Sequence, residues 1–194
     1  MRNFDVRIIP KIIIIGDPAV GKTTICNRYL GCPFEHRYIS TIGVDFFSKD
    51  SIYETHSGIR VMVSWSLWDI AGQVRFRDIV DQFFKGANSA IVVYDITDRE
   101  SFENVRNWLQ RFWDVAGEKP AVIVGNKTDL RDKKGQVSTE EGKELAEELS
   151  KEKGMPFFFV ETSAKFGENL DLLFRMLFNA VIWIKIKEKE ERDR

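Results

Sequence analysis

The sequence predicts an α/β fold in three layers, with helices on both faces of a mainly parallel sheet. Four apolar runs of strand length, at residues 12–15, 90–94, 121–124 and 157–160, are each followed by polar residues and then by a helical pattern. Two longer strand candidates, 44–54 and 60–68, lie between the first two runs and are joined through a polar turn. They predict one antiparallel hairpin at the edge of the sheet.

The length and composition of the chain predict one domain. A chain of 194 residues with 43% hydrophobic residues can bury one substantial core, so we expect a single domain over residues 1–194, in which 178–194 extend a C-terminal helix. The net charge of −1 gives no global basic field that would attract nucleic acid. We therefore expect no nucleic-acid partner and a monomer.

The cysteines and the apolar segments indicate a cytoplasmic protein. Cys26 and Cys32 are the only cysteines, too few for a zinc site, so we expect reduced thiols. The apolar stretch 8–15 contains Pro10 and Lys11 and is too short to span a bilayer. We expect a cytoplasmic location, with peripheral contact to membranes left open.

Two helix starts are predicted by capping-box spacings. Thr97 with Glu100 precedes the helical pattern at 102–115, and Ser138 with Glu141 precedes the pattern at 145–149. Gly154 is expected to end the second of these helices.

The last predicted helix begins near Asn169 and is apolar on more than one face. The side chains expected to face the sheet are Leu170, Leu173, Leu177 and Val181. Three further apolar side chains exceed what one face needs: Trp183, Ile184 and Ile186. They are open to four interpretations, namely a partner protein, a membrane surface, a neighbouring molecule in a crystal or a longer core contact.

A phosphate-binding loop follows the first apolar run. Residues 16–23 read Gly-Asp-Pro-Ala-Val-Gly-Lys-Thr, which fits G-x-x-x-x-G-K-[ST], a loop whose backbone N–H groups converge on phosphates. Lys22 is expected to contact the β- and γ-phosphates, and Thr23 to ligate Mg²⁺. The predicted phosphate-binding residues are Gly16, Asp17, Pro18, Ala19, Val20, Gly21, Lys22, Thr23 and Thr24.

A second polar segment indicates which base accompanies the phosphates. Asn126-Lys127-Thr128-Asp129 directly follows a strand candidate. The carboxylate of Asp129 can accept two hydrogen bonds from the N1–H and amino groups of guanine, a donor pair that adenine lacks. Asn126 is expected to hold two loops together, and the stem of Lys127 to lie on the purine face.

A third motif follows the second strand of the hairpin and reads Asp69-Ile70-Ala71-Gly72-Gln73. Asp69 is placed to hold Mg²⁺, Gly72 to offer its N–H to the γ-phosphate, and Gln73 to orient an attacking water. Thr41 can reach Mg²⁺ and the γ-phosphate only when GTP is bound. The predicted metal ligands are thus Thr23, Thr41 and Asp69.

With these motifs in order, the chain resembles a small GTPase of the Ras superfamily over about residues 12–177. The resemblance implies the P-loop NTPase fold, α/β in three α/β/α layers, with a six-stranded mainly parallel sheet, one antiparallel edge strand and five helices. It also assigns base-supporting roles to Ser163, Ala164 and Lys165 in Glu-Thr-Ser-Ala-Lys, and to Phe34.

Within the superfamily the chain is most similar to the Rab branch. That likeness rests on the segments 42–46, 75–77 and 93–97. It implies that Phe46, Trp68 and Phe83 form an aromatic triad presented to effectors. It also implies that an activating protein and an exchange factor act on two switch segments, the first around Thr41 and the second around Gly72. Tyr38 has two open interpretations, a cover for the γ-phosphate or a solvent-exposed side chain.

Four features depart from the Rab pattern or add to it. Pro18 brings no N–H, so we expect slow hydrolysis without loss of binding. The hairpin and the segment 131–155 are longer than usual, and no C-terminal cysteine is present, so membrane association would not use prenylation of this chain. Arg37 precedes Thr41 closely, leaving open an internal arginine finger or an exposed loop arginine.

The sequence therefore predicts a GTPase switch that binds GTP or GDP with Mg²⁺ and slowly hydrolyses GTP, with a role in membrane trafficking left open. The residues expected to act in hydrolysis are Gln73, Lys22, Thr41 and Gly72. One alternative is a nucleotide-locked binding scaffold with little turnover. An ATP-dependent kinase is disfavoured by Asp129.

Overall fold

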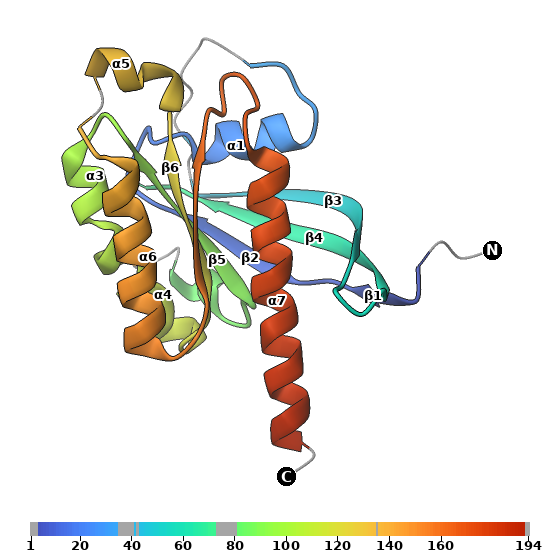
Figure 1. The fold of residues 1–194 in the computed structure, drawn as a ribbon. Helices are drawn as coiled ribbons and strands as arrows, with labels where there is room; N and C mark the ends of the chain where they lie inside the picture. The colour runs from blue at the N-terminus through green and yellow to red at the C-terminus, as the bar shows by residue number, and fades with distance from the viewer. Residues whose placement is uncertain (1–3, 35–40, 42, 73–80, 135, 193–194) are drawn as a thin grey trace.

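The computed structural model describes residues 4–34, 41, 43–72, 81–134 and 136–192. Within these ranges seven strands form one sheet, mostly parallel, with helices on both faces (Figure 1). The strands are β1 (Val6–Ile8), β2 (Lys11–Ile15), β3 (Val44–Glu54), β4 (Arg60–Ile70), β5 (Ser89–Asp95), β6 (Ala121–Asn126) and β7 (Phe157–Thr162). Across the sheet the order is β1-β4-β2-β5-β6-β7, with β3 also paired to β4.

β1 and β2 act as one interrupted strand beside β4. Ile8 pairs with Val63 and Lys11 with Ser66, so the register is the same on both sides of the break. Pro10 lies in the break and has no N–H to give to a ladder, although its carbonyl still accepts from the Ser66 N–H at 3.1 Å. The predicted six-stranded sheet with one antiparallel edge strand, β3, is therefore confirmed, with its first strand divided.

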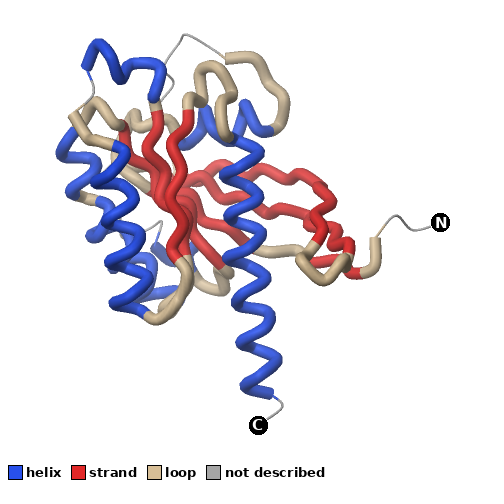
Figure 2. The backbone as a smooth tube through the Cα atoms, in the orientation of Figure 1, coloured by secondary structure: helices blue, strands red, loops and turns tan. Residues whose placement is uncertain are grey.

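The helices cover the two faces of the sheet unequally. The α-helices are α1 (Lys22–Tyr29), α3 (Arg99–Glu103), α4 (Val105–Ala116), α5 (Arg131–Lys134), α6 (Thr139–Lys153) and α7 (Leu170–Arg192), and the 3₁₀ helices are η2 (Asp81–Phe84) and η3 (Thr128–Leu130). α1 and α7 lie on one face, while α3, α4 and α6 lie on the other (Figures 1 and 2). The predicted α/β/α layering is thus confirmed.

Two apolar cores result from the period-two alternation of β2. Ile12 and Ile14 belong to the core beneath α1 and α7, whereas Ile13 and Ile15 belong to the core beneath α4 and α6. All four are fully buried. Each such side chain contributes about 1.5–3 kcal/mol by leaving water, so this central strand stabilises both layers.

α7 packs along the sheet as the sequence predicts, since Leu170, Leu173, Leu177 and Val181 are all buried. Ile184, which the sequence left open among four interpretations, is 3% exposed and therefore a core side chain. Ile186 is 52% exposed, in the last turns, which project beyond the sheet (Figure 1). Within the described ranges, no helix is long and apolar enough to cross a membrane.

One of the two predicted helix caps is wrong. The N-cap of α3 is Asp98, whose carboxylate accepts from the Ser101 N–H, while the N–H and hydroxyl of Thr97 both donate to Asp95 at 2.8 Å. The Asp98 carboxylate, one residue later, is free to accept from the unpaired N–H groups of the first helical turn, whereas the Thr97 hydroxyl is already bonded to Asp95.

The second predicted cap is confirmed. Ser138 and Glu141 form a reciprocal capping box at the start of α6. The same helix ends at Gly154, whose φ of 63° is left-handed.

Candidate functional site

The motif-bearing loops meet at one edge of the sheet. β2, β4, β6 and β7 run parallel within the sheet, so the segments after Ile15, Ile70, Asn126 and Thr162 all leave from the carboxyl ends of strands. This edge lies at the top of Figure 1, next to the start of α1. It is the usual position of a ligand site in an open α/β sheet.

The phosphate loop curls around the ammonium group of Lys22. Its Nζ donates to the carbonyl oxygens of Gly16 at 2.9 Å and of Asp17 at 2.8 Å. Gly21, which precedes α1, has a φ of 104°, and a Cβ there would collide with the Asn126 amide. Glycine at 21 thus lets the loop approach Asn126 closely.

Burial and nearby carboxylates act in opposite directions on Lys22. Only 6% of the residue is exposed, and burial lowers its pKa to about 8, while the charges of Asp69 and Asp17 raise it. The two carboxylates therefore offset part of the cost of holding a buried cation beside the loop.

The three predicted metal ligands lie together. The Thr23 hydroxyl donates to Oδ2 of Asp69 and lies 2.9 Å from the hydroxyl oxygen of Thr41. Asp69 is fully buried, and burial raises its pKa to about 6 against the opposing effects of the Thr23 hydrogen bond and the Lys22 charge. Its other oxygen, Oδ1, has no hydrogen-bond partner among the described residues.

This donor set fits Mg²⁺. Two hydroxyls and a carboxylate are hard oxygen ligands, which Mg²⁺ prefers, and the buried Oδ1 of Asp69 is an acceptor without a partner in the described part of the chain. A bound metal ion would also favour the charged form of the Asp69 carboxylate, and this effect opposes the burial that raises the pKa of Asp69.

Gly72 packs directly on the phosphate loop. A Cβ at this position would lie 2.6 Å from the carbonyl carbon of Asp17 and 2.6 Å from the nitrogen of Pro18. Only glycine leaves room for this approach without moving one of the two segments. The start of the second predicted switch segment is thus in backbone contact with the loop.

Asn126 joins three segments of the site. Its Nδ2 donates to the carbonyl of Val20 at 2.8 Å, and its Oδ1 accepts from the Thr162 hydroxyl and from the Ala164 N–H, both at 3.1 Å. The residue is 2% exposed. The predicted tie between loops is present and links the phosphate loop to both base-binding segments.

The remaining residues that are predicted to bind the base lie near that tie. Asp129 accepts from the Ser163 hydroxyl at 2.7 Å. Lys127 is left-handed with a φ of 70° and forms an ion pair with Asp95 at 2.6 Å. Lys165 is exposed, with its ammonium 5.1 Å from the centre of the Phe166 ring.

The other predicted site residues that the structure describes lie in the phosphate loop, in the helix after it or just beyond that helix. Pro18 and Ala19 are exposed at its tip, Val20 is buried, and Thr24 is half-buried in α1. Phe34 is half-buried. Gln73, Tyr38 and Arg37 lie outside the described residues, so their predicted roles stay predictions.

Sequence reasoning missed several side chains that hold the site. Glu161 accepts from Arg131 and, at 2.9 Å, from the hydroxyl of Thr139, which clamps the segment after Asp129 to the end of β7. Asn104 and Trp108, near and in α4, both donate to the carboxylate of Asp17. These contacts cross large sequence separations, so no local pattern could have indicated them.

The predicted aromatic triad is a contiguous cluster. The Trp68 ring lies 5.5 Å from that of Phe46 and 5.8 Å from that of Phe83, centre to centre. Phe46 is 58% exposed, and the ammonium of Lys11 lies 4.4 Å from the centre of the Trp68 ring. We call Phe46, Trp68 and Phe83 the aromatic cluster.

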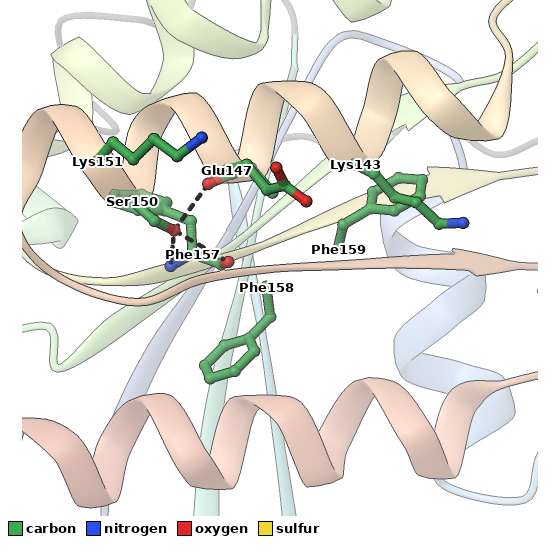
Figure 3. Close-up of a pocket in the computed structure, with 8 residues that line it drawn as sticks. Lys143, Glu147, Ser150, Lys151, Phe157, Phe158 and Phe159 are labelled. Carbon is green, nitrogen blue, oxygen red and sulfur yellow. Dashed lines mark hydrogen bonds between the residues drawn. The ribbon is translucent and has the colours of Figure 1, made fainter.

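A separate groove of about 500 Å³ runs along α6 and β7 (Figure 3). Its lining includes Lys143, Glu147 and Lys151 from α6 and residues 157–159 of β7. None of the predicted nucleotide-binding residues lines it. The loop cluster at the strand ends is therefore the better candidate site.

A comparison with protein-family models identifies one match. The model described as the Ras family matches residues 11–182 of the 194-residue chain. The matched range begins at the first residue of β2 and ends within α7. It includes every loop of the candidate site.

Proposed function

The chain belongs to the Ras family, and from this premise we propose that it is a guanine-nucleotide switch that binds GTP or GDP with Mg²⁺ and slowly hydrolyses GTP. Ras-family proteins are GTP-binding switch GTPases in general. The residue roles, the turnover and the cellular process of this chain are our proposals.

The observation that carries the proposal is the three-way tie made by Asn126. One buried side chain links the phosphate loop at Val20 to Ala164, while Asp129 accepts from the hydroxyl of Ser163. A ligand that uses both parts must have a polyphosphate joined to a base with two adjacent donors. Guanine nucleotides have this combination.

In the proposed reaction, a water attacks the γ-phosphorus in line and GDP leaves. Lys22 and the loop N–H groups stabilise the negative charge on the phosphoryl oxygens, and Gln73 orients the water. Thr23, Thr41 and Asp69 would hold Mg²⁺. When bound, the metal neutralises charge on the β- and γ-phosphate oxygens.

Single-turnover hydrolysis tests the catalytic part of the proposal. Gln73→Leu removes the group that orients water, so we expect GTP loaded on the purified variant to be hydrolysed at least about tenfold more slowly than on the parent chain. Gln136→Leu, at an exposed position outside the proposed machinery, is the matched control. Equal rates for Gln73→Leu and the parent would remove Gln73 from the mechanism.

A nucleotide-locked scaffold is the second candidate, and Pro18 favours it. Proline supplies no N–H to the γ-phosphate and stiffens the loop, which lowers turnover without weakening the other phosphate contacts. The nucleotide content of purified protein, followed for hours with Mg²⁺, separates the two. Conversion of bound GTP to GDP supports the switch, and persistent GTP supports the scaffold.

We also propose that effectors contact the aromatic cluster in a Rab-like manner, in membrane trafficking. Phe46 and Trp68 lie close in sequence to Thr41 and Gly72, whose contacts are proposed to depend on the bound nucleotide. An exposed aromatic surface at this position suits binding that differs between the GTP and GDP forms. The test is a pull-down with protein loaded with GDP or with a non-hydrolysable GTP analogue. Phe46→Ala should lose the proteins retained only in the GTP form, whereas Ile59→Ala, exposed at the hairpin end, should retain them.

A further inference from the structure

Asp17 presents an electrostatic problem within the phosphate loop. It is the second residue of a loop that is proposed to bind a polyphosphate, and a carboxylate close to phosphate oxygens is repelled by them. The position must therefore direct its negative charge away from the ligand or neutralise it.

Both oxygens of this carboxylate accept hydrogen bonds from residues in α4 or at its start. Oδ1 accepts from the indole Nε1 of Trp108 at 2.7 Å, and Oδ2 accepts from Nδ2 of Asn104 at 2.8 Å. Hydrogen bonds to an ionised acceptor are stronger than neutral ones. The charge of Asp17 is thus stabilised from α4.

The two donors are themselves fixed in place. Trp108 is 3% exposed within the core under α4, and the guanidinium carbon of Arg111 lies 4.6 Å from its ring centre. Asn104 lies at the junction of α3 and α4, and its Oδ1 accepts from Asn107 at 3.2 Å. The anchor is therefore a packed helix and not a mobile surface side chain.

At its other end, Asp17 belongs to the backbone that shapes the candidate site. Its carbonyl accepts from Lys22, and its peptide with Pro18 lies against Gly72. The following proline also restricts the backbone of Asp17 to extended conformations. A shift of the Asp17 side chain would move the groups that contact Lys22 and Gly72.

We propose that Asp17 is a positioning residue, held by Trp108 and Asn104, through which α4 sets the geometry of the phosphate loop. The inference rests on the proposed function, because the geometry matters only if the loop holds a nucleotide. The side chain of Asp17, whose oxygens accept from Trp108 and Asn104, acts through the loop backbone.

Two tryptophan substitutions in α4 provide the test. Trp108→Phe removes the donor to Asp17, while the matched control Trp113→Phe removes a hydrogen bond to the carbonyl of Lys119, away from the loop. We expect GDP to dissociate about tenfold faster from Trp108→Phe and less than about twofold faster from Trp113→Phe, with similar losses of thermal stability. Asn104→Ala, at a half-exposed position, gives the same readout if Trp108→Phe does not fold.

A double-mutant cycle completes the test. Asp17→Ala alone should also speed dissociation about tenfold, and Asp17→Ala with Trp108→Phe should remain near tenfold, because both changes break the same link. A hundredfold effect in the double variant, or equal dissociation rates for the two tryptophan variants, would overturn the inference. If the parent chain binds no guanine nucleotide, the proposed function itself fails.

Discussion

Asn126 and Asp129 show how closely single residues in this site depend on their partners. Asn126 uses both its donor and its acceptor within the protein, so it has a fixed orientation. Asp129 receives one hydrogen bond from Ser163 and has further acceptor capacity for a ligand. Their proposed roles in base recognition lead to a direct prediction.

Asp129→Asn should reverse the base preference. The substitution replaces one acceptor oxygen with an NH₂ donor, which would face a donor of guanine, so we expect GDP affinity to fall about 100-fold or more. Xanthosine diphosphate, which has an oxygen in place of the amino group, should bind the variant better than GDP. Fluorescence titration with both nucleotides measures the change.

The control for this prediction is Asp132→Asn, an exposed carboxylate in α5. It should bind GDP as the parent chain does. If Asp129→Asn retained GDP affinity within about threefold, the carboxylate at 129 would not discriminate between the bases.

Residues that the sequence places in contiguous motifs lie close together in the structure, but the sequence did not indicate the side chains that support them. Thr23 and Asp69 were assigned to one metal site because loop and strand-end positions carry that chemistry, and the structure brings them together. Trp108 and Asn104 were not assigned, because their contact with Asp17 depends on how α4 packs against the sheet. Asp95 was likewise missed as the partner of Lys127.

Among the secondary-structure elements, α6 offers two tests of local stability. The first concerns the capping box of Glu141. Hydrogen bonding from the Ser138 backbone N–H, followed by the contact with Arg99, lowers the pKa of Glu141 from 4.5 to about 2. A depressed pKa stabilises the folded state above pH 4.5, and this contribution is lost as the pH falls towards 2.

Glu141→Gln should therefore lower the free energy of unfolding by about 1 kcal/mol at neutral pH and by less at about pH 3. Urea unfolding at the two pH values measures the difference. Glu140→Gln, in the same helical turn, serves as the control, because the capping box uses Glu141 and not Glu140. If Glu141→Gln lowered the free energy of unfolding equally at both pH values, the charge of the cap would be ruled out as the cause.

The second test concerns Gly142, where α6 approaches the sheet. A Cβ at this position would overlap the Phe159 ring and lie 2.8 Å from the hydroxyl oxygen of Tyr94. Alanine favours a helix over glycine by about 1 kcal/mol, but overpacking costs about 1–3 kcal/mol. We expect a net loss of stability in Gly142→Ala.

Thermal unfolding checks this sign. Lys143→Ala, at the next and exposed position, should change the melting temperature little. A more stable Gly142→Ala would mean that Phe159 can move aside at little cost.

The helix caps also show where sequence patterns reach their limit. Ser138 and Glu141 satisfied the capping-box spacing and form the box. Thr97 and Glu100 satisfied it equally well, yet the hydroxyl of Thr97 donates to Asp95 and Asp98 caps the helix. Spacing identified both helices, but the competition between neighbouring oxygens decided the exact start.

For the molecule as a whole, ligand binding should raise global stability. GDP with Mg²⁺ at about 100 times its dissociation constant should add about 2.7 kcal/mol to the free energy of unfolding. For a chain of this size that corresponds to an increase in melting temperature of about 5–11 °C. ADP at the same concentration should produce no comparable shift in a thermal melt.

At this scale the sequence predicted the layers, the parallel sheet and the edge hairpin correctly. It did not predict β1, because the segment Val6–Ile8 is only three residues long, includes the charged Arg7 and is separated from β2 by Pro10. Its pairing depends on the length of β4, which extends far enough to take both parts of the first strand. Such an extension of the sheet is a tertiary property and not a local one.

The position of β2 in the middle of the sheet has a consequence for biosynthesis. Ile12 pairs with Leu67 on β4 and with Ser89 on β5, so an early segment waits for partners that leave the ribosome much later. Until then its four consecutive isoleucines have no native neighbours in the sheet. Nascent chains that end before β5 should therefore be the ones that engage chaperones, and folding should be slow for the chain's length.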